Sequence, residues 1–424
     1  MIYGIKKLTA AVLAVLLAAS LCACGSEDTS ESTSESGTAD IIFDEDWNPA
    51  KESEGLPKMT TQYATEEMIK RSVYNEGNLS RLAHAMQKAK DGEKVTLATI
   101  GGSITQGSSA SNPKEAYANK FLEWWQLAFP NAEIELHNAG IGATDSYIGV
   151  HRVKSDVLDF KPDVVVAEFS VNDTNQLVNP ISYDNLVRRL LTSESNPAVI
   201  LLFTTQEDGT SFQDTHSKTG KAYDLPMISY KNAVLPEIKA GSFTWKDISP
   251  DNIHPNTRGH AIIGELMCAY LNSVLEKLDD IDKNVSAFED EPLTKDTYMQ
   301  GRILNALNTE PSQLGSFEKK DVSNQFKGNW TTESGEESII FEVDAANIGI
   351  MYYRTTDGRS GIYQVFVDGK LKGTLNGNFV GGWGNYTECT QLVTNETAGK
   401  HTVEIKKSAS SEASAMSIIG LLVS

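Results

Sequence analysis

The chain has 424 residues, which is long enough for two or three domains that each bury a hydrophobic core. Its formal net charge of −20 at pH 7 argues against binding nucleic acid or an anionic membrane surface through charge, because phosphate groups would be repelled. Part of this charge lies in residues 26–58, which are rich in Ser, Thr, Asp and Glu and too poor in apolar residues to fold alone.

The N-terminal residues 1–24 predict export from the cytoplasm. Lys6 and Lys7 precede an almost wholly apolar run at residues 8–21, which is too short to span a bilayer as a stable helix. The run ends in Leu21-Cys22-Ala23-Cys24-Gly25, which resembles the lipobox of bacterial lipoproteins. In a lipobox the cysteine after a small residue is lipidated and becomes the mature N-terminus.

We therefore expect Cys24 to carry the lipid and residues 25–58 to form a disordered tether at the outer face of the bacterial cell membrane. Ordinary cleavage of the signal, which would leave the protein secreted, is the alternative. Cys268 and Cys389 would then be the remaining cysteines. They fall in different predicted domains, which argues against a disulfide framework, and their spacing fits no zinc site.

Residues 66–90 carry apolar side chains mostly at intervals of three and four, which predicts an amphipathic helix, broken near Gly77. Strands and helices then alternate. The expected strands are short apolar runs at residues 95–100, 133–136, 163–169 and 198–204, with a weaker one at 225–229. The expected helices lie at residues 117–129, 147–158, 183–191 and 259–278.

This alternation predicts a parallel α/β sheet with right-handed crossovers in a domain over residues 59–280. Active residues of such sheets lie at the carboxyl ends of the strands. We therefore expect chemistry in the loops that follow Ile100, Leu136, Phe169 and Thr204.

From about Asp279 the pattern changes to an acidic linker followed by alternating segments, which predicts a small antiparallel β-sandwich over residues 281–424. The expected strands lie at residues 338–343, 348–353, 361–367, 387–393, 401–406 and 417–423. Val367-Asp368-Gly369-Lys370 is a hairpin turn signal between two such runs.

Ser103 follows the first strand of the α/β pattern directly, behind Gly101 and Gly102. Glycines at this point let the backbone turn sharply and approach a substrate closely, and they leave the hydroxyl near amides that point at bound negative charge. Taken by itself, the motif favours an ordinary strand-to-helix turn in which Ser103 caps a helix.

Two further strand exits carry groups that can stabilise an oxyanion. Asn138-Ala139-Gly140-Ile141-Gly142-Ala143 is a glycine-rich turn whose amides would lie beside the Ser103 turn. Phe169-Ser170-Val171-Asn172-Asp173 places a carboxamide after the third strand, and one such donor is typically worth about 3 kcal/mol of barrier. The alternative for Asn172 is a plain turn-forming role.

Asp251-Asn252-Ile253-His254-Pro255 precedes the final long helix. A separation of three residues lets a turn bring the Asp251 carboxylate to one imidazole nitrogen of His254 while the other nitrogen faces a nucleophile. Among the seven histidines, His216, two residues after Asp214 in a polar loop, is the one rival base.

Together these residues resemble the SGNH, or GDSL-like, hydrolase superfamily over about Leu79 to Leu278. Four blocks occur in the family order: the Ser103 block, Gly140 to Thr144, Val171-Asn172-Asp173, and Asp251-x-x-His254-Pro255. The resemblance implies a flavodoxin-like three-layer α/β/α fold and a triad of Ser103, His254 and Asp251. It also implies oxyanion donors from the Ser103 amide, a second-block amide and the Asn172 side chain, with no metal or organic cofactor.

Two positions depart from the family pattern. Gly102 replaces the Asp of Gly-Asp-Ser, a variant that resembles the Gly-Gly-Ser-Ile-Thr branch containing many bacterial carbohydrate esterases. In the second block, Ala143 stands where many relatives place the donating glycine. An alanine amide donates as well as a glycine amide unless the backbone needs a positive φ, so either Gly142 or Ala143 can be the donor.

The predicted second domain carries aromatic side chains that could stack on sugars, chiefly Trp383 and Tyr386 in Gly381-Gly382-Trp383-Gly384-Asn385-Tyr386. The glycine-rich setting predicts an exposed loop, where binding residues concentrate. Packing inside the sandwich is the alternative.

Export, tethering and a sandwich beside an esterase resemble modular enzymes that remove acetyl groups from plant or cell-wall polysaccharides. We expect a serine esterase that hydrolyses O-acyl, chiefly O-acetyl, esters of an acetylated polysaccharide or oligosaccharide, without nucleic acid as a partner and with the membrane reached through the lipid only. A lipase or thioesterase acting on longer acyl chains is the alternative within the superfamily, although no apolar lid stretch favours it. A noncatalytic glycan-binding surface lipoprotein is the alternative of another class, and the intact set of site residues argues against it.

Overall fold

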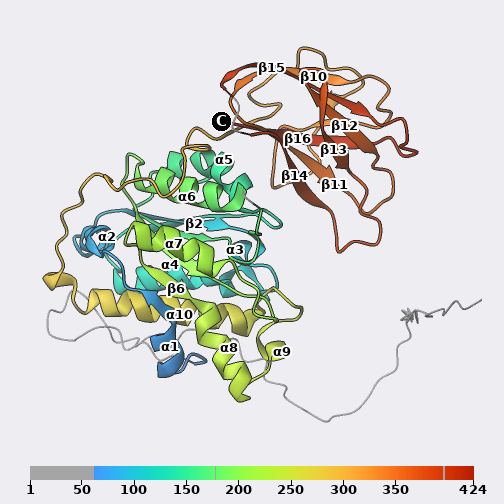
Figure 1. Ribbon diagram of the computed structural model, residues 1–424. Helices are drawn as coiled ribbons and strands as arrows, with labels where there is room; N and C mark the ends of the chain where they lie inside the picture. The colour runs from blue at the N-terminus through green and yellow to red at the C-terminus, as the bar shows by residue number, and fades with distance from the viewer. Residues whose placement is uncertain (1–61, 177, 395–396) are drawn as a thin grey trace, which may run out of the picture. The chain divides into compact units, whose positions relative to one another are not determined.

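The computed structural model describes residues 62–176, 178–394 and 397–424 (Figure 1). The predicted signal peptide, Cys24 and the tether lie outside the described residues. No helix in these described ranges is long and apolar enough to cross a membrane. The described residues belong to one compact unit that contains an α/β part and a β-sandwich.

The α/β part is built on a six-stranded sheet with the order β1-β6-β5-β4-β2-β3. Strands β2 to β6 run parallel, and β1 pairs with β6 in the antiparallel direction. The bounds of the strands are β1 Val73–Asn75, β2 Val95–Gly101, β3 Ile134–Gly140, β4 Val164–Glu168, β5 Ala198–Phe203 and β6 Met227–Ser229. The predicted parallel sheet is thus confirmed.

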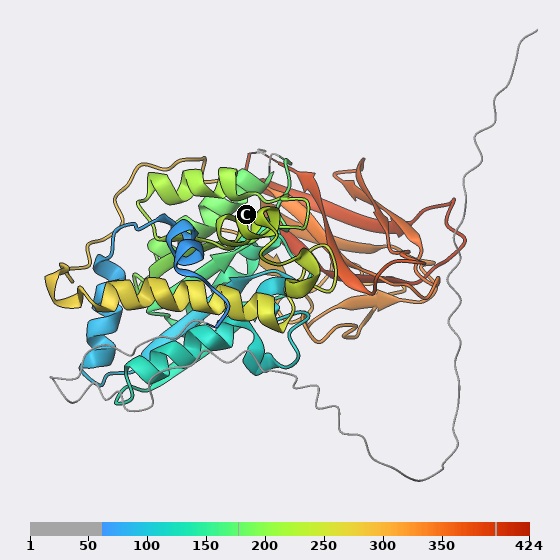
Figure 2. The ribbon, with the colours of Figure 1, turned by 90° about the horizontal axis from the view of Figure 1, so that it is seen from below.

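Helices cover both faces of this sheet (Figures 1 and 2). Alternate residues of each central strand point to opposite faces, so that in β4 Val164 and Val166 enter one core while Val165 and Ala167 enter the other. Helices α1, α2, α4, α8 and α10 pack on the first face, and α5 and α6 pack on the second. Burial of both faces explains why these strands read as continuous apolar runs.

The helices of the α/β part include five longer than ten residues, α2, α4, α5, α6 and α10, that the sequence pattern predicted at least in part. Their bounds are α1 Glu66–Ser72, α2 Ser80–Lys90, α3 Ser103–Gln106, α4 Tyr117–Ala128, α5 Ser146–Asp156, α6 Val178–Leu191, α7 Gln213–Ala222, α8 Tyr230–Ala240, α9 Trp245–Ile248 and α10 Thr257–Leu275. Single turns of 3-10 helix lie at Pro113–Glu115, Leu158–Phe160 and Leu278–Asp280.

Two sequence predictions about these elements need correction. The helical pattern over residues 66–90 is broken near Gly77, as predicted, but the break also contains strand β1, because Val73 and Asn75 pair with β6 and form the edge of the sheet. The second strand continues to Gly140 rather than ending at Leu136, because its residues through Gly140 pair with β2. The loop that can carry chemistry therefore begins at Ile141.

The second part is a sandwich of two antiparallel sheets, as predicted. One sheet has the order β10-β15-β12-β13, and the other has the order β14-β11-β16-β9-β8, with β7 also paired to β16. The bounds are β7 Arg302–Leu304, β8 Glu318–Lys319, β9 Trp330–Thr332, β10 Ile339–Ala345, β11 Ile348–Arg354, β12 Ile362–Val367, β13 Lys370–Asn376, β14 Tyr386–Val393, β15 Gly399–Lys407 and β16 Met416–Val423. The hairpin between β12 and β13 turns at Asp368 and Gly369, whose φ angles of 51° and 73° fit a type I′ turn.

The sandwich and the α/β part share a hydrophobic core. Tyr147 and Val150 of α5 belong to the same cluster of buried residues as Met351 of β11 and Leu422 of β16. A hydrogen bond from the Gln391 side chain to the Tyr298 hydroxyl, at 2.7 Å, joins the linker to β14. The sandwich is therefore packed against the helices on the second face of the α/β sheet.

Candidate active site

Ser103 is the first residue of α3 and follows β2 directly. The turn before it requires glycine: a Cβ atom on Gly101 would lie 2.2 Å from the Thr105 hydroxyl oxygen and 2.4 Å from the Glu168 carbonyl oxygen. The Ser103 side chain remains 8% exposed, at the floor of a cleft. The sequence motif thus produces a close-packed turn that presents one hydroxyl to solvent.

His254 and Asp251 complete a relay with this hydroxyl. The Ser103 Oγ lies 2.9 Å from His254 Nε2, and His254 Nδ1 lies 2.8 Å from Asp251 Oδ2. The turn is closed by the backbone amides of Ile253 and His254, which donate to Asp251 Oδ1 at 2.8 and 2.7 Å. The three-residue spacing therefore places the imidazole between an anion and a hydroxyl, as the sequence predicted.

The electrostatics of this turn keep Asp251 ionised. Partial burial acts to raise the pKa of the carboxyl, but the donated amides and the His254 ring outweigh it, so the pKa of Asp251 lies below its ordinary value. The backbone carbonyl of Asp251 accepts a hydrogen bond from the Trp245 indole at 2.6 Å, which ties the turn to α9. An ionised Asp251 can orient the imidazole and stabilise it when it takes up a proton.

The turn after β3 holds the two candidate amides of the second block. The Gly142 amide donates to the Gln106 side-chain oxygen at 2.7 Å, whereas no hydrogen bond from the Ala143 amide is found in the part of the chain that the structure describes. Ala143 has φ 58°, in the left-handed region that L residues rarely adopt. This backbone conformation explains why a glycine would suit the position.

Asn172 lies across Gly102, beside Ser103. A Cβ atom on Gly102 would lie 2.2 Å from the Asn172 Oδ1. The same oxygen is buried and has no hydrogen-bond partner among the described residues. The Asn172 carboxamide thus occupies the space that a side chain at position 102 would take, and its Nδ2 group, not this buried oxygen, is the atom that can donate to an oxyanion in the cleft.

A cleft of about 750 Å³ brings together every site residue that the sequence analysis singled out in the described ranges. Its lining includes Ser103, Gly142, Ala143, Asn172, Asp251, His254, Trp383 and Tyr386. It also includes Gln106, Ser108, Asn252, Ile253, Gln325 and Asn385. The sandwich therefore forms one wall of the cleft that contains the relay.

The aromatic part of this wall is held firmly. The rings of Trp383 and Tyr386 stack with centroids 4.8 Å apart, and the edge of Phe379 contacts both. Arg354 lies 4.6 Å above the Phe379 ring and donates to the Tyr386 hydroxyl at 2.7 Å. Trp383 nevertheless stays 72% exposed, so its ring is presented to solvent rather than packed in the sandwich core.

His216, the rival base, lies elsewhere. It is buried, its Nε2 lies 2.8 Å from Asp173 Oδ2, and its ring stacks on Tyr183 with centroids 3.5 Å apart. Asp173 in turn accepts from the Ser146 amide at 2.8 Å at the start of α5. His216 therefore fixes the turn that carries Asn172 and does not approach the Ser103 hydroxyl.

Sequence reasoning missed three residues that shape the site. Gln106 lies three residues after Ser103, a spacing that could have indicated it. Gln325 lies in the second part of the chain and had no sequence signal. Arg152 is 1% exposed on α5 and donates to the carbonyls of Gly101 at 2.9 Å and Ala139 at 2.7 Å, so it ties the ends of β2 and β3 together.

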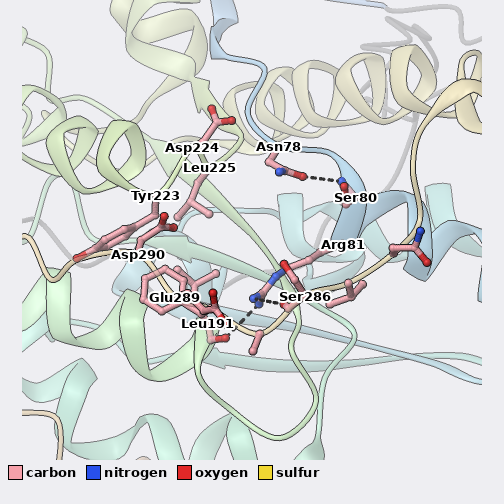
Figure 3. Close-up of a pocket in the computed structure, with 14 residues that line it drawn as sticks. Asn78, Ser80, Arg81, Leu191, Tyr223, Asp224, Leu225, Ser286, Glu289 and Asp290 are labelled. Carbon is pink, nitrogen blue, oxygen red and sulfur yellow. Dashed lines mark hydrogen bonds between the residues drawn. The ribbon is translucent and has the colours of Figure 1, made fainter.

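A second cavity, of about 280 Å³, lies where the linker after α10 crosses α2 and the end of α7 (Figure 3). Arg81 reaches across it and donates to the carbonyls of Leu191, Pro197 and Ser286. These contacts hold the linker against the α/β part. Ser80, Ser286 and Tyr223 carry the hydroxyl groups in the lining of this cavity. The lining contains no histidine, so the cavity offers no counterpart of the relay.

Comparisons with known proteins agree with this fold. Residues 99–262 match the model of the GDSL-like lipase/acylhydrolase family. The crystal structures of a two-domain esterase (CEX) active on acetylated mannans, one of them with mannopentaose, are 31% identical with a TM-score of 0.77. They cover 84% of this chain, and the match spans 97% and 98% of theirs.

An acetyl xylan esterase, AlAXEase, is 20% identical over 41% of this chain and 98% of its own, with a TM-score of 0.35, which is too low to support an inference. No curated protein matches the chain.

The match to the two-domain esterase extends over both parts of the fold. The chain therefore belongs to the SGNH, or GDSL-like, hydrolase superfamily. It is a carboxylic ester hydrolase with a C-terminal β-sandwich.

Proposed function

We propose that this hydrolase removes O-acetyl groups from an extracellular or cell-wall polysaccharide through a triad of Ser103, His254 and Asp251. The observation that carries the proposal is the relay of 2.9 and 2.8 Å at the floor of a cleft whose wall is the sandwich. A hydroxyl, a base and an orienting anion in this order are the parts that acyl transfer to water requires.

In the proposed reaction Ser103 Oγ attacks the ester carbonyl while His254 Nε2 takes up the hydroxyl proton. Asp251 holds the imidazole and stabilises its charge. The oxyanion accepts hydrogen bonds from the Ser103 amide, the Ala143 amide and the Asn172 side chain. His254 then gives the proton to the leaving sugar oxygen, which departs as a hydroxyl, and water repeats the sequence to release acetate and free Ser103.

The walls of the cleft favour a carbohydrate over a long acyl chain. Asn252 and Asn385 offer amide groups that can bond sugar hydroxyls, and Trp383 offers an exposed ring face for stacking. The related two-domain esterase is active on acetylated mannans. An acetylated mannan is therefore the first substrate to test, with an acetylated xylan beside it.

The proposal is tested with aryl esters from acetate to octanoate and with acetate release from the two polysaccharides. We expect the highest kcat/KM for the acetate, and a loss of kcat of at least about 10⁴-fold in Ser103→Ala and about 10⁴-fold in Asp251→Asn. Melting temperatures within a few degrees of wild type would show that the variants fold. An optimum at octanoate would favour the lipase or thioesterase alternative, and wild-type hydrolysis by Ser103→Ala would refute the triad.

Trp383→Ala provides the matched comparison for the substrate. Because the indole is far more exposed than the relay, its loss should leave kcat on the aryl acetate unchanged while raising KM for the acetylated polysaccharide. Equal effects on both substrates would contradict a stacking role. The enzyme would work outside the cell, tethered through Cys24, which the sequence motif supports.

A further inference from the structure

Gln106 lies on the wall of the cleft, one helical turn after Ser103. Its side-chain oxygen accepts the hydrogen bond from the Gly142 amide at 2.7 Å. The Gly142 N–H is thus directed at Gln106 and not at the place where an oxyanion would form beside Ser103. The next amide, that of Ala143, has no such partner among the described residues.

A residue of the second part of the chain contacts the same oxygen. Gln325, in the loop before β9, donates from Nε2 to Gln106 Oε1 at 3.3 Å. Two N–H donors therefore converge on one carbonyl oxygen. They fix which way the Gln106 carboxamide faces, because the opposite orientation would set its NH₂ group against both donors.

The turn after β3 needs such support. Ala143 has φ 58°, a conformation in which the Cβ atom of an L residue crowds its own backbone. A turn of this kind persists only when surrounding contacts hold it. The bond from the Gly142 amide to Gln106 is a contact that holds it from the side of the cleft, next to the nucleophile.

We infer that Gln106 and Gln325 are a positioning pair for the oxyanion hole. Gln106 binds the Gly142 amide and so turns the Ala143 amide toward the oxyanion, and Gln325 orients Gln106. Through Gln325, the second part of the chain thereby contributes to the acyl-transfer step as well as to substrate binding. This inference rests on the proposed function, because it assigns the amide that stabilises the oxyanion formed on Ser103.

The test uses the full-length protein and 4-nitrophenyl acetate, a substrate too small to need the sugar-binding wall. Gln106→Met keeps the length of the side chain but removes the acceptor. We expect its kcat to fall about tenfold with KM changed less than twofold, since a misdirected donor costs less than the 10²-fold or more that follows from losing one. Gln325→Met should lower kcat about threefold.

Gln325→Glu separates orientation from packing. A carboxylate at 325 repels Gln106 Oε1 and attracts its NH₂ group, which turns the oxygen away from Gly142. We therefore expect a larger loss of kcat in Gln325→Glu than in Gln325→Met, although the two replacements are of similar size. In the Gln106→Met background neither change at 325 should lower kcat further, because the group that Gln325 orients is gone.

Asn324→Ala is the control, because Asn324 is exposed in the same loop, does not line the cleft, and among the described residues its side chain is hydrogen-bonded to Lys327 alone. It should retain wild-type kcat. Wild-type kcat in Gln106→Met, equal kcat in the two Gln325 variants, or a change confined to KM would each overturn the inference. Such results with hydrolysis still abolished by Ser103→Ala would leave the proposed function standing, whereas activity that survives Ser103→Ala would refute the proposed function itself.

Discussion

Gly102 leaves the space beside Ser103 that Asn172 fills. The superfamily motif has an aspartate there, and in this chain the Asn172 carboxamide lies in the corresponding space, with its Oδ1 2.2 Å from a Cβ atom built on Gly102. The two residues come from turns after neighbouring strands, β2 and β4. The glycine is therefore needed for the place that Asn172 takes beside the nucleophile.

Gly102→Ala should displace Asn172 without touching the relay. We expect kcat for an aryl acetate to fall about 10²-fold, the typical effect of losing one oxyanion donor, with a smaller change in KM. Gly399→Ala is the matched control, because its Cβ would find its nearest neighbour at 3.9 Å. Unchanged kcat in Gly102→Ala, measured with a normal melting temperature, would show that Asn172 does not act as a donor.

At the scale of elements, strand β4 ends on a buried carboxyl beneath the site. Glu168 Oε1 accepts from the Ser170 amide and hydroxyl at 3.1 Å each and from the Thr204 hydroxyl at 2.7 Å, while Oε2 is buried without a partner among the described residues. Burial raises the pKa of Glu168 to about 7, against the lowering effect of these donors. Between about pH 4.5 and pH 7 the group is thus more protonated in the folded protein than in the unfolded chain.

The sign of the resulting pH dependence follows from this difference. Between the ordinary pKa of 4.5 and about 7, the folded state binds more protons at Glu168 than the unfolded state, so its contribution to stability falls as pH rises. Glu168→Gln mimics the protonated acid and keeps the accepting oxygen. Its melting temperature should exceed that of wild type by an amount that grows from pH 5 to pH 7.5, to roughly a few degrees.

Thermal melts across this pH range, with the exposed Glu412→Gln as a control, check the prediction. A constant difference between Glu168→Gln and wild type would mean that Glu168 does not titrate in this window. The result bears on the site because Ser170, which bonds Glu168, lies two residues before Asn172.

At the scale of the whole molecule, the sandwich is joined to the α/β part both by packing and across the cleft. Gly349 of β11 lies so close to Tyr147 of α5 that an added Cβ would meet the Tyr147 hydroxyl at 2.3 Å. Gln325 reaches the Gln106 side chain on the other side. The two parts therefore bury a common core and line a common cleft.

Lipid anchoring is the prediction that belongs to the whole chain. If Cys24 is lipidated, the mature protein should stay with the membrane fraction, and mass spectrometry of its N-terminal peptide should show an acylated cysteine. Cys24→Ala should move the protein out of the membrane fraction without changing the kcat of the enzyme that is recovered. An unmodified N-terminus released to the medium would instead support ordinary cleavage and secretion.

Much of the fold followed from local patterns. Strands β2, β4 and β5 are buried on both faces and are therefore apolar throughout, whereas buried and exposed residues alternate in a sandwich strand such as β10. The prediction used these two patterns of hydrophobicity. Strand β1 was missed because its three residues continue the helical spacing, yet they form the edge of the sheet by pairing with β6, over 150 positions away, and tertiary pairing overrides such short propensities.

The sequence by itself determined the order of the chemical groups: Ser103, Asn172 and the Asp251–His254 turn each follow a strand or precede a helix of a parallel sheet. Carboxyl ends of parallel strands share one edge, so these groups had to meet. Only the tertiary structure decided that the Gly142 amide is bound by Gln106 and that Gln325, 219 residues away from Gln106, contacts the same oxygen. Contacts between side chains of such distant segments depend on how two folded parts pack, and no spacing along the chain encodes them.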